Sequence, residues 1–185
     1  NEQEYFEAPG LAALVFHNTY PEGKQGGLEL IQHGERIATN GDVRLELAPG
    51  QWATFPKAGQ REIDTEQRTI KVPLEYVDVP FAYQVRVWTE EEALCLAVDI
   101  ESPLPAELEG KISFNLELFP GAYIGKTFHF GETFGIFPQQ ANGPMLPDAD
   151  GHVLPLPLST GNTLAIALED PLRALTIESL HGELA

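Results

Sequence analysis

The chain has 185 residues, 43% of them hydrophobic, and its 28 acidic residues against 11 basic ones give a formal net charge of −17. The length suits one domain with a real core, and the hydrophobic fraction is typical of a globular rather than a disordered protein. The charge argues against binding to nucleic acid or to an anionic membrane surface, because both need Lys and Arg to meet phosphate, and no apolar run approaches the roughly 20 residues of a membrane span.

Short alternating or apolar runs predict strands along most of the chain. In chain order they cover residues 11–16, 28–32, 42–48, 68–77, 81–89, 93–100, 111–119, 126–130, 133–137, 162–168 and 173–179. The 15 Pro and 17 Gly interrupt nearly every candidate helix, and only residues 105–110 indicate a single helical turn. We therefore predict one all-β sandwich domain over residues 1–185, and we keep open the large two-sheet supersandwich form.

The densest polar cluster lies in residues 33–44, and its members are His33, Glu35, Arg36, Asn40, Asp42 and Arg44. Asn-Gly is a strong signal for a tight hairpin, so we expect Asn40-Gly41 at a hairpin tip, where a Val in place of Gly41 would strain the turn.

Strand alternation places Arg44 and Glu46 on one face and Val43 and Leu45 on the other. We interpret the charged side as the solvent-exposed face of a strand. The alternative is a proton-transfer couple of His33 with Glu35 or Asp42, but no nucleophile motif accompanies it.

Metal and cofactor motifs find little support. The five histidines show no H-x-H or H-x-x-x-H spacing, and the single Cys95 lies in an apolar run that predicts a buried, inert thiol. Residues 148–151, "DADG", resemble the start of a calcium loop but lack its later ligands, so a turn is the favoured interpretation. No G-x-S-x-G, P-loop or G-x-G-x-x-G occurs, and we predict no catalytic residue, no metal site and no cofactor.

Four aromatic residues are weak candidates for contact with a carbohydrate or with a neighbouring domain: Trp52, Trp88, Tyr20 and Tyr123. Trp52 follows "APGQ" and is expected in a loop, whereas Trp88 falls on the parity opposite to Phe81, Tyr83, Val85 and Val87 and is expected to be partly exposed. Aromatic rings stack on sugars, but each ring could equally belong to the core.

Several blocks of the sequence resemble one known protein region. Residues 5–52, "FNLELFPGAYIGKTF" (114–128), "GIFPQQANGPM" (135–145) and "PLSTGNTLAIALEDPLRALTIES" (157–179) are similar to the N-terminal region of glycoside hydrolase family 9 proteins of the Bacteroides type. The resemblance implies a β-sandwich placed before an immunoglobulin-like module and an α/α-barrel that cleaves β-glucans. No stretch here matches the barrel, so no catalytic residue is carried over.

The expected function is that of a non-catalytic N-terminal module of a secreted or periplasmic, polysaccharide-degrading glycoside hydrolase. It is expected to pack against the downstream catalytic region of its own chain and, as a second and less favoured role, to assist in binding β-glucan. A start without Met and a strand-like end suggest a piece of a longer protein. The alternatives are a standalone carbohydrate-active enzyme that uses the His33–Asp42 region, and a purely structural module.

Overall fold

A computed structural model describes residues 1–185 except residues 22, 24, 49, 50, 53, 54, 140–144, 148–152 and 156. Strands make up 52% of the chain and helices 4%, which confirms the predicted all-β, sandwich-like class. The sequence suggested one domain, whereas the folded chain divides into two compact units, Asn1–Glu117 and Leu118–Ala185, which are described one at a time. Among the described residues, none of the helices is both long and apolar enough to cross a bilayer.

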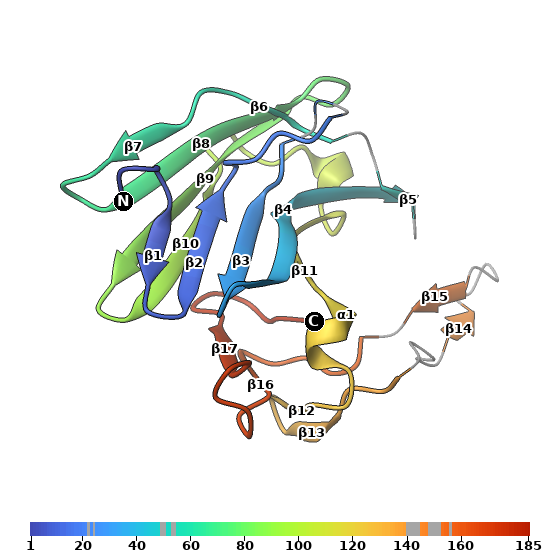
Figure 1. The fold of residues 1–185 in the computed structure, drawn as a ribbon. Coiled ribbons are helices and arrows are strands. Elements are labelled where there is room, and N and C mark those ends of the chain that lie inside the picture. The colour runs from blue at the N-terminus through green and yellow to red at the C-terminus, as the bar shows by residue number, and fades with distance from the viewer. Residues whose placement is uncertain are drawn as a thin grey trace. The chain divides into compact units, whose positions relative to one another are not determined.

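The first sheet of the first unit has the strand order β1-β2-β3-β4-β11, and β5 pairs with β4 (Figure 1). Its strands are β1 (Phe6–Ala8), β2 (Leu11–Val15), β3 (Leu28–Gln32), β4 (Glu35–Ala48), β5 (Gln51–Trp52) and β11 (Ile112–Leu118). A short 3-10 helix, η1 (Ala106–Leu108), precedes β11 and confirms the predicted helical turn.

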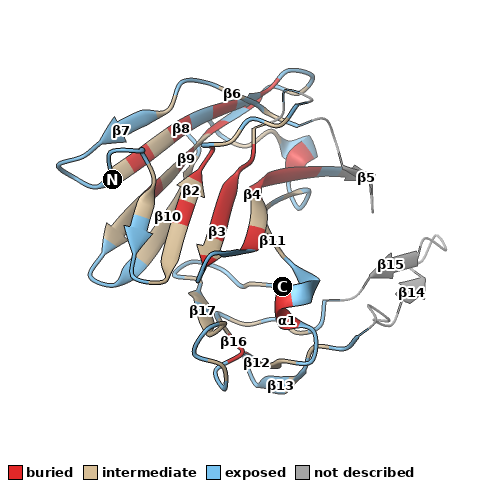
Figure 2. Ribbon diagram, in the orientation of Figure 1, coloured by how far each residue is buried: buried red, intermediate tan, exposed pale blue. Residues whose placement is uncertain are grey.

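The second sheet of this unit has the order β10-β9-β8-β6, and β7 pairs with β8. Its strands are β6 (Lys57–Ala58), β7 (Glu62–Asp64), β8 (Thr69–Tyr76), β9 (Phe81–Glu90) and β10 (Ala93–Asp99). Alternate residues of β8 and β9 are buried, and they are Ile70, Val72, Leu74, Tyr76, Phe81, Tyr83, Val85 and Val87. Buried residues thus follow alternating positions along these strands (Figure 2), as a sheet with one core-facing side requires.

The second unit is built around a four-stranded sheet of order β13-β12-β16-β17. Its strands are β12 (Thr127–Phe130), β13 (Thr133–Ile136), β16 (Thr163–Ile166) and β17 (Leu175–Glu178), and the short helix α1 (Pro120–Tyr123) precedes them. A separate hairpin joins β14 (Met145–Pro147) to β15 (Val153–Pro155). Residues 148–151, which resemble the start of a calcium loop, lie outside the described residues.

The hairpin turn between β3 and β4 lies at His33-Gly34, and the predicted tip at Asn40-Gly41 is wrong. Gln32 pairs with Glu35, and the two residues between them have φ angles of 49° and 82°, as a two-residue hairpin loop with two positive φ angles requires. Asn40 has a φ of 53°, but it lies within the continuous strand β4.

Two bulges explain how β4 accommodates Asn40. The pairing runs Ile31 with Arg36, Leu30 with Ala38 and Leu28 with Gly41, so β4 gains one extra residue at each of two places. Asparagine tolerates a positive φ better than most residues, and here that property serves a bulge instead of a turn. Local sequence could not distinguish the two uses, because they share the same backbone requirement.

Gly41 is required by close packing between β3 and β4. A Cβ atom at this position would lie 2.6 Å from the Leu28 Cβ and 3.0 Å from the Leu116 Cδ1. The φ angle of Gly41 is not positive, so a larger residue would not be strained in the way that a turn predicts. It would instead clash with Leu28 and Leu116.

We predict that Gly41→Ala lowers the free energy of unfolding by about 1–3 kcal/mol, because the two strands must separate to admit a methyl group. Gly121→Ala is the matched control, since a Cβ there would meet nothing within 4 Å. Urea denaturation followed by circular dichroism measures both. Equal stability of the two variants would contradict the close-packing explanation.

Candidate functional site

The polar cluster of the sequence contributes to two buried carboxylates, and the first is Glu29 on β3. Glu29 is 0% exposed, and it accepts hydrogen bonds from Asn18 Nδ2, from Tyr20 Oη at 2.9 Å and from Thr39 Oγ1 at 3.3 Å. Arg36 Nη1 lies 3.2 Å from Glu29 Oε1 and balances the charge. A buried charge is tolerated when it is paired and hydrogen-bonded, so Glu29 is a structural anchor that holds the loop carrying Asn18 and Tyr20 against the sheet.

The second buried carboxylate, Asp42 on β4, links the two sheets. Asp42 is 7% exposed and accepts hydrogen bonds from Tyr83 Oη on β9 and from its neighbouring Val43 N, both at 2.7 Å. Tyr76 Oη on β8 donates to the Val43 carbonyl at 3.0 Å. Burial, and then the nearby negative charge of Asp42, raise the pKa of Tyr76 to about 12. The same two causes raise the pKa of Tyr83 further, so both hydroxyls stay protonated and keep donating.

Arg44 is also buried, at 5% exposure. Its guanidinium lies over the Phe55 ring, 4.9 Å from the centroid, and Nη2 lies 3.6 Å from Glu117 Oε1. Asn40 Nδ2 donates to the other oxygen of Glu117 at 2.7 Å. Glu117 on β11 therefore ties together two positions of β4.

The prediction that this side of β4 faces solvent is wrong for Asp42 and Arg44, although Glu46 is exposed. The reason is that residues distant in the sequence, on β9 and β11, cover these side chains. The alternation of polar and apolar residues within β4 alone cannot reveal such partners.

The structure does not bring His33 and Asp42 together. His33 is an exposed turn residue whose N–H donates to the Gly10 carbonyl at 2.7 Å, whereas Asp42 is buried further along β4. Seven residues of strand separate Glu35 from Asp42, which corresponds to roughly 20 Å. His33 and Asp42 therefore do not form a proton-transfer couple.

Trp88 lies on the face of the second sheet that points away from the buried residues of β9. It is half-buried, as its parity predicted, and it pairs with Thr69 on β8 and with Cys95 on β10. The Arg86 guanidinium lies over the indole, 4.7 Å from the ring centroid. We call the outward-facing residues Thr69, Gln84, Arg86, Trp88, Cys95 and Asp99 the Trp88 face.

Arg86 on this face is held by Asp99. Its Nε and Nη2 atoms donate to the two Asp99 carboxylate oxygens at 2.9 and 3.1 Å. These hydrogen bonds hold the pKa of Asp99 below its ordinary 3.8. Burial opposes them, and the charges of Arg86 and Lys71 contribute further to the lowering. The bidentate contact fixes the guanidinium, so the indole and its charged neighbour form a preorganised surface.

The other predicted contact residues do not join Trp88. Tyr20 is engaged by Glu29, and Tyr123 in α1 is only 3% exposed, too buried to stack on a sugar. Trp52 lies in the two-residue strand β5, paired with Glu46, instead of in a loop, and its side chain lies outside the described part of the structure. Cys95 is half-buried on the outward parity, so the prediction of a buried thiol is wrong.

No group of three or more His, Cys, Asp and Glu side chains in the described part of the chain could hold a metal ion. Comparisons of the chain with protein-family models, with curated proteins and with solved structures found no match. Inference about function therefore starts from the Trp88 face and the other described residues.

We predict that Glu29→Gln lowers the free energy of unfolding by about 2–4 kcal/mol, because Arg36 and three hydrogen-bond donors lose a charged acceptor. Glu66→Gln, at an exposed position, is the control and should change stability by less than about 0.5 kcal/mol. Chemical denaturation of both variants tests this, and a change at Glu29 as small as at Glu66 would rule out the anchoring role.

We also predict that the emission of Trp88 reports the titration of Asp99. A depressed folded-state pKa means that the Arg86–Asp99 pair is fully formed above pH 3.8 and is lost as the pH falls through the lower, folded-state value. In a Trp52→Phe background, emission should change in that acidic window while far-UV circular dichroism stays constant. The same transition in Asp99→Asn would show that another group causes it.

Proposed function

We propose that this chain is a non-catalytic β-sandwich module of a secreted or periplasmic, polysaccharide-degrading glycoside hydrolase, and that its Trp88 face contacts β-glucan. The observation that carries the proposal is the half-buried Trp88 indole on an outward sheet face, with Arg86 and Asp99 held beside it. The resemblance of most of the chain to the N-terminal region of family 9 glycoside hydrolases supplies the polysaccharide context.

The chemistry of the Trp88 face suits a neutral sugar. An indole offers an apolar surface for the C–H face of a pyranose ring, and the Arg86 and Asp99 groups can exchange hydrogen bonds with hydroxyls. Their mutual bidentate contact lowers the entropy cost of ordering them on binding. The net charge of −17 favours a neutral glucan over an anionic polysaccharide.

The buried carboxylates support a non-catalytic role. Glycoside hydrolysis in most families needs two carboxyl groups that flank the glycosidic bond. Glu29 and Asp42 are almost inaccessible, and both are engaged in contacts that maintain the fold. We therefore expect no release of reducing sugar from β-glucan by the purified chain.

A second candidate is that the Trp88 face docks on a downstream domain of the same protein. The combination of Trp88 and Arg86 favours it, because Trp and Arg are enriched where protein surfaces meet. Docking would shift the Trp88 emission to the blue in a longer chain that carries the next domain, and would leave it unchanged on addition of glucan.

Affinity electrophoresis and calorimetry with soluble β-glucan test the proposal. We expect weak binding, roughly millimolar or about 4 kcal/mol, because a single ring provides the stacking surface. Trp88→Ala should abolish the binding. Phe134→Ala, which removes a ring that is 76% exposed in the second unit, should leave it unchanged.

Three outcomes would contradict this function. Glucan binding that survives Trp88→Ala in a folded variant would remove the Trp88 face from the interaction. No binding of glucan, with a blue shift in the longer chain, would establish docking in its place. Sustained release of reducing sugar that is lost on changing one carboxylate would make the chain an enzyme.

A further inference from the structure

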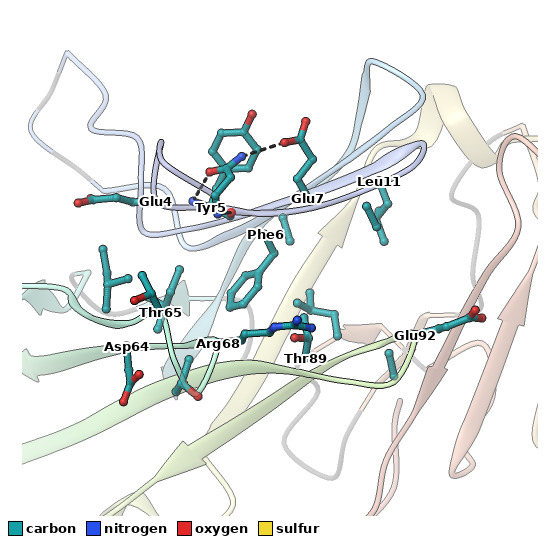
Figure 3. Close-up of a pocket in the computed structure, with 18 of the residues that line it drawn as sticks. Glu4, Tyr5, Phe6, Glu7, Leu11, Asp64, Thr65, Arg68, Thr89 and Glu92 are labelled. Carbon is teal, nitrogen blue, oxygen red and sulfur yellow. Dashed lines mark hydrogen bonds between the residues drawn. The ribbon is translucent and has the colours of Figure 1, made fainter.

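A cavity of about 710 Å³ opens in the first unit between the N-terminal segment with β1 and β2 and the opposite sheet (Figure 3). Its far wall is formed near the β7–β8 turn and the β9–β10 turn. The volume lies in the range of sites that bind small molecules. Trp88 does not line this cavity, although Thr69 of the Trp88 face does, so a ligand in the cavity does not need the indole.

The interior of the cavity is largely apolar. Phe6 on β1 points into it (Figure 3). Three other strands supply further apolar lining residues, namely Leu11, Ile70 and Leu94. Phe6 and Leu94 are only partly covered by the protein itself. An apolar ligand body would cover these two side chains, and the removal of apolar surface from water would favour binding.

The mouth of the cavity is strongly acidic. Glu4 is paired with Arg61, whose Nη1 lies 3.4 Å from Glu4 Oε2. In contrast, Glu2, Glu91 and Glu92 line the cavity without an ion pair to any described residue.

Glu91 and Glu92 form the two-residue turn between β9 and β10, and Glu91 has a φ of 51°. Such a turn favours Asn and Gly, so two adjacent glutamates there are not explained by the turn itself. Their charges are available to a ligand.

Arg68 is the one Lys or Arg side chain among the described residues that line the cavity. It comes from the end of the β7–β8 turn and extends below Phe6 (Figure 3). Its positive charge and the N-terminal ammonium group of Asn1 are outnumbered by the surrounding carboxylates, so the cavity as a whole favours a cation.

From this charge complementarity we propose that the cavity binds a small molecule with an apolar, aromatic body and a protonated amine. The body lies against Phe6 and the apolar wall, and the ammonium group meets the carboxylates of Glu91 and Glu92. Because these carboxylates are exposed, the attraction is screened by salt and the affinity falls as ionic strength rises.

Calorimetric titration of the full chain with three probes of similar shape tests this inference. The probes are 2-phenylethylammonium, neutral 2-phenylethanol and anionic 3-phenylpropanoate. We expect the ammonium to bind at least tenfold more tightly than the alcohol, and the carboxylate to bind most weakly. Equal or tighter binding of 3-phenylpropanoate, or no binding of the ammonium at millimolar concentration, would overturn the proposal.

Variants of the charged lining residues test whether negative charge favours binding and positive charge opposes it. The double variant Glu91→Gln/Glu92→Gln should weaken binding of 2-phenylethylammonium about tenfold, whereas Arg68→Gln should strengthen it severalfold by removing a like charge. Glu107→Gln/Glu109→Gln is the matched control, because both residues are exposed and neither lines the cavity. Circular dichroism checks that each variant is folded, and weaker binding of 2-phenylethylammonium by Arg68→Gln would contradict the proposed charge preference.

Discussion

The hydrogen bond from Tyr83 to the buried Asp42 carboxylate is the contact on which the first unit depends. A carboxylate that loses its partners in a protein interior costs several kcal/mol, so Asp42 fixes how β4 of one sheet meets β9 of the other. Glu29 imposes a similar constraint on β3, because its partners come from a loop and from β4. The sandwich is therefore specified by polar contacts as well as by its apolar core.

The bulges in β4 make these contacts possible. Each bulge adds a residue to β4 relative to β3 and so changes which side chains point to which face beyond it. Asn40 supplies the positive φ and also donates to Glu117, while Gly41 allows the close approach of Leu28. Asn40-Gly41 lies at the second of the two bulges, so this dipeptide sets the course of β4 directly before the buried Asp42 and Arg44.

The two proposed binding surfaces differ in how their charges are used. On the Trp88 face, Asp99 pairs with Arg86, so the polar groups beside the indole are held in place and can exchange hydrogen bonds with hydroxyl groups. At the cavity mouth, Glu91 and Glu92 make no ion pair with a described residue, and their charge is free to attract a cation. The strong acidity of the chain therefore contributes to recognition at one surface and is locally compensated at the other.

The sequence by itself determined the longer strands, because hydrophobic alternation depends only on neighbours along the chain: β8, β9, β10 and the outward position of Trp88 all follow from it. The sequence did not predict the short strands β1, β5, β6, β7, β14 and β15, since two or three residues carry no period. Only the tertiary structure decided that Asp42 and Arg44 are buried, that Tyr123 is covered and that His33-Gly34 forms the turn. These features depend on partners that are distant in sequence, or on a choice between two sites that both tolerate a positive φ.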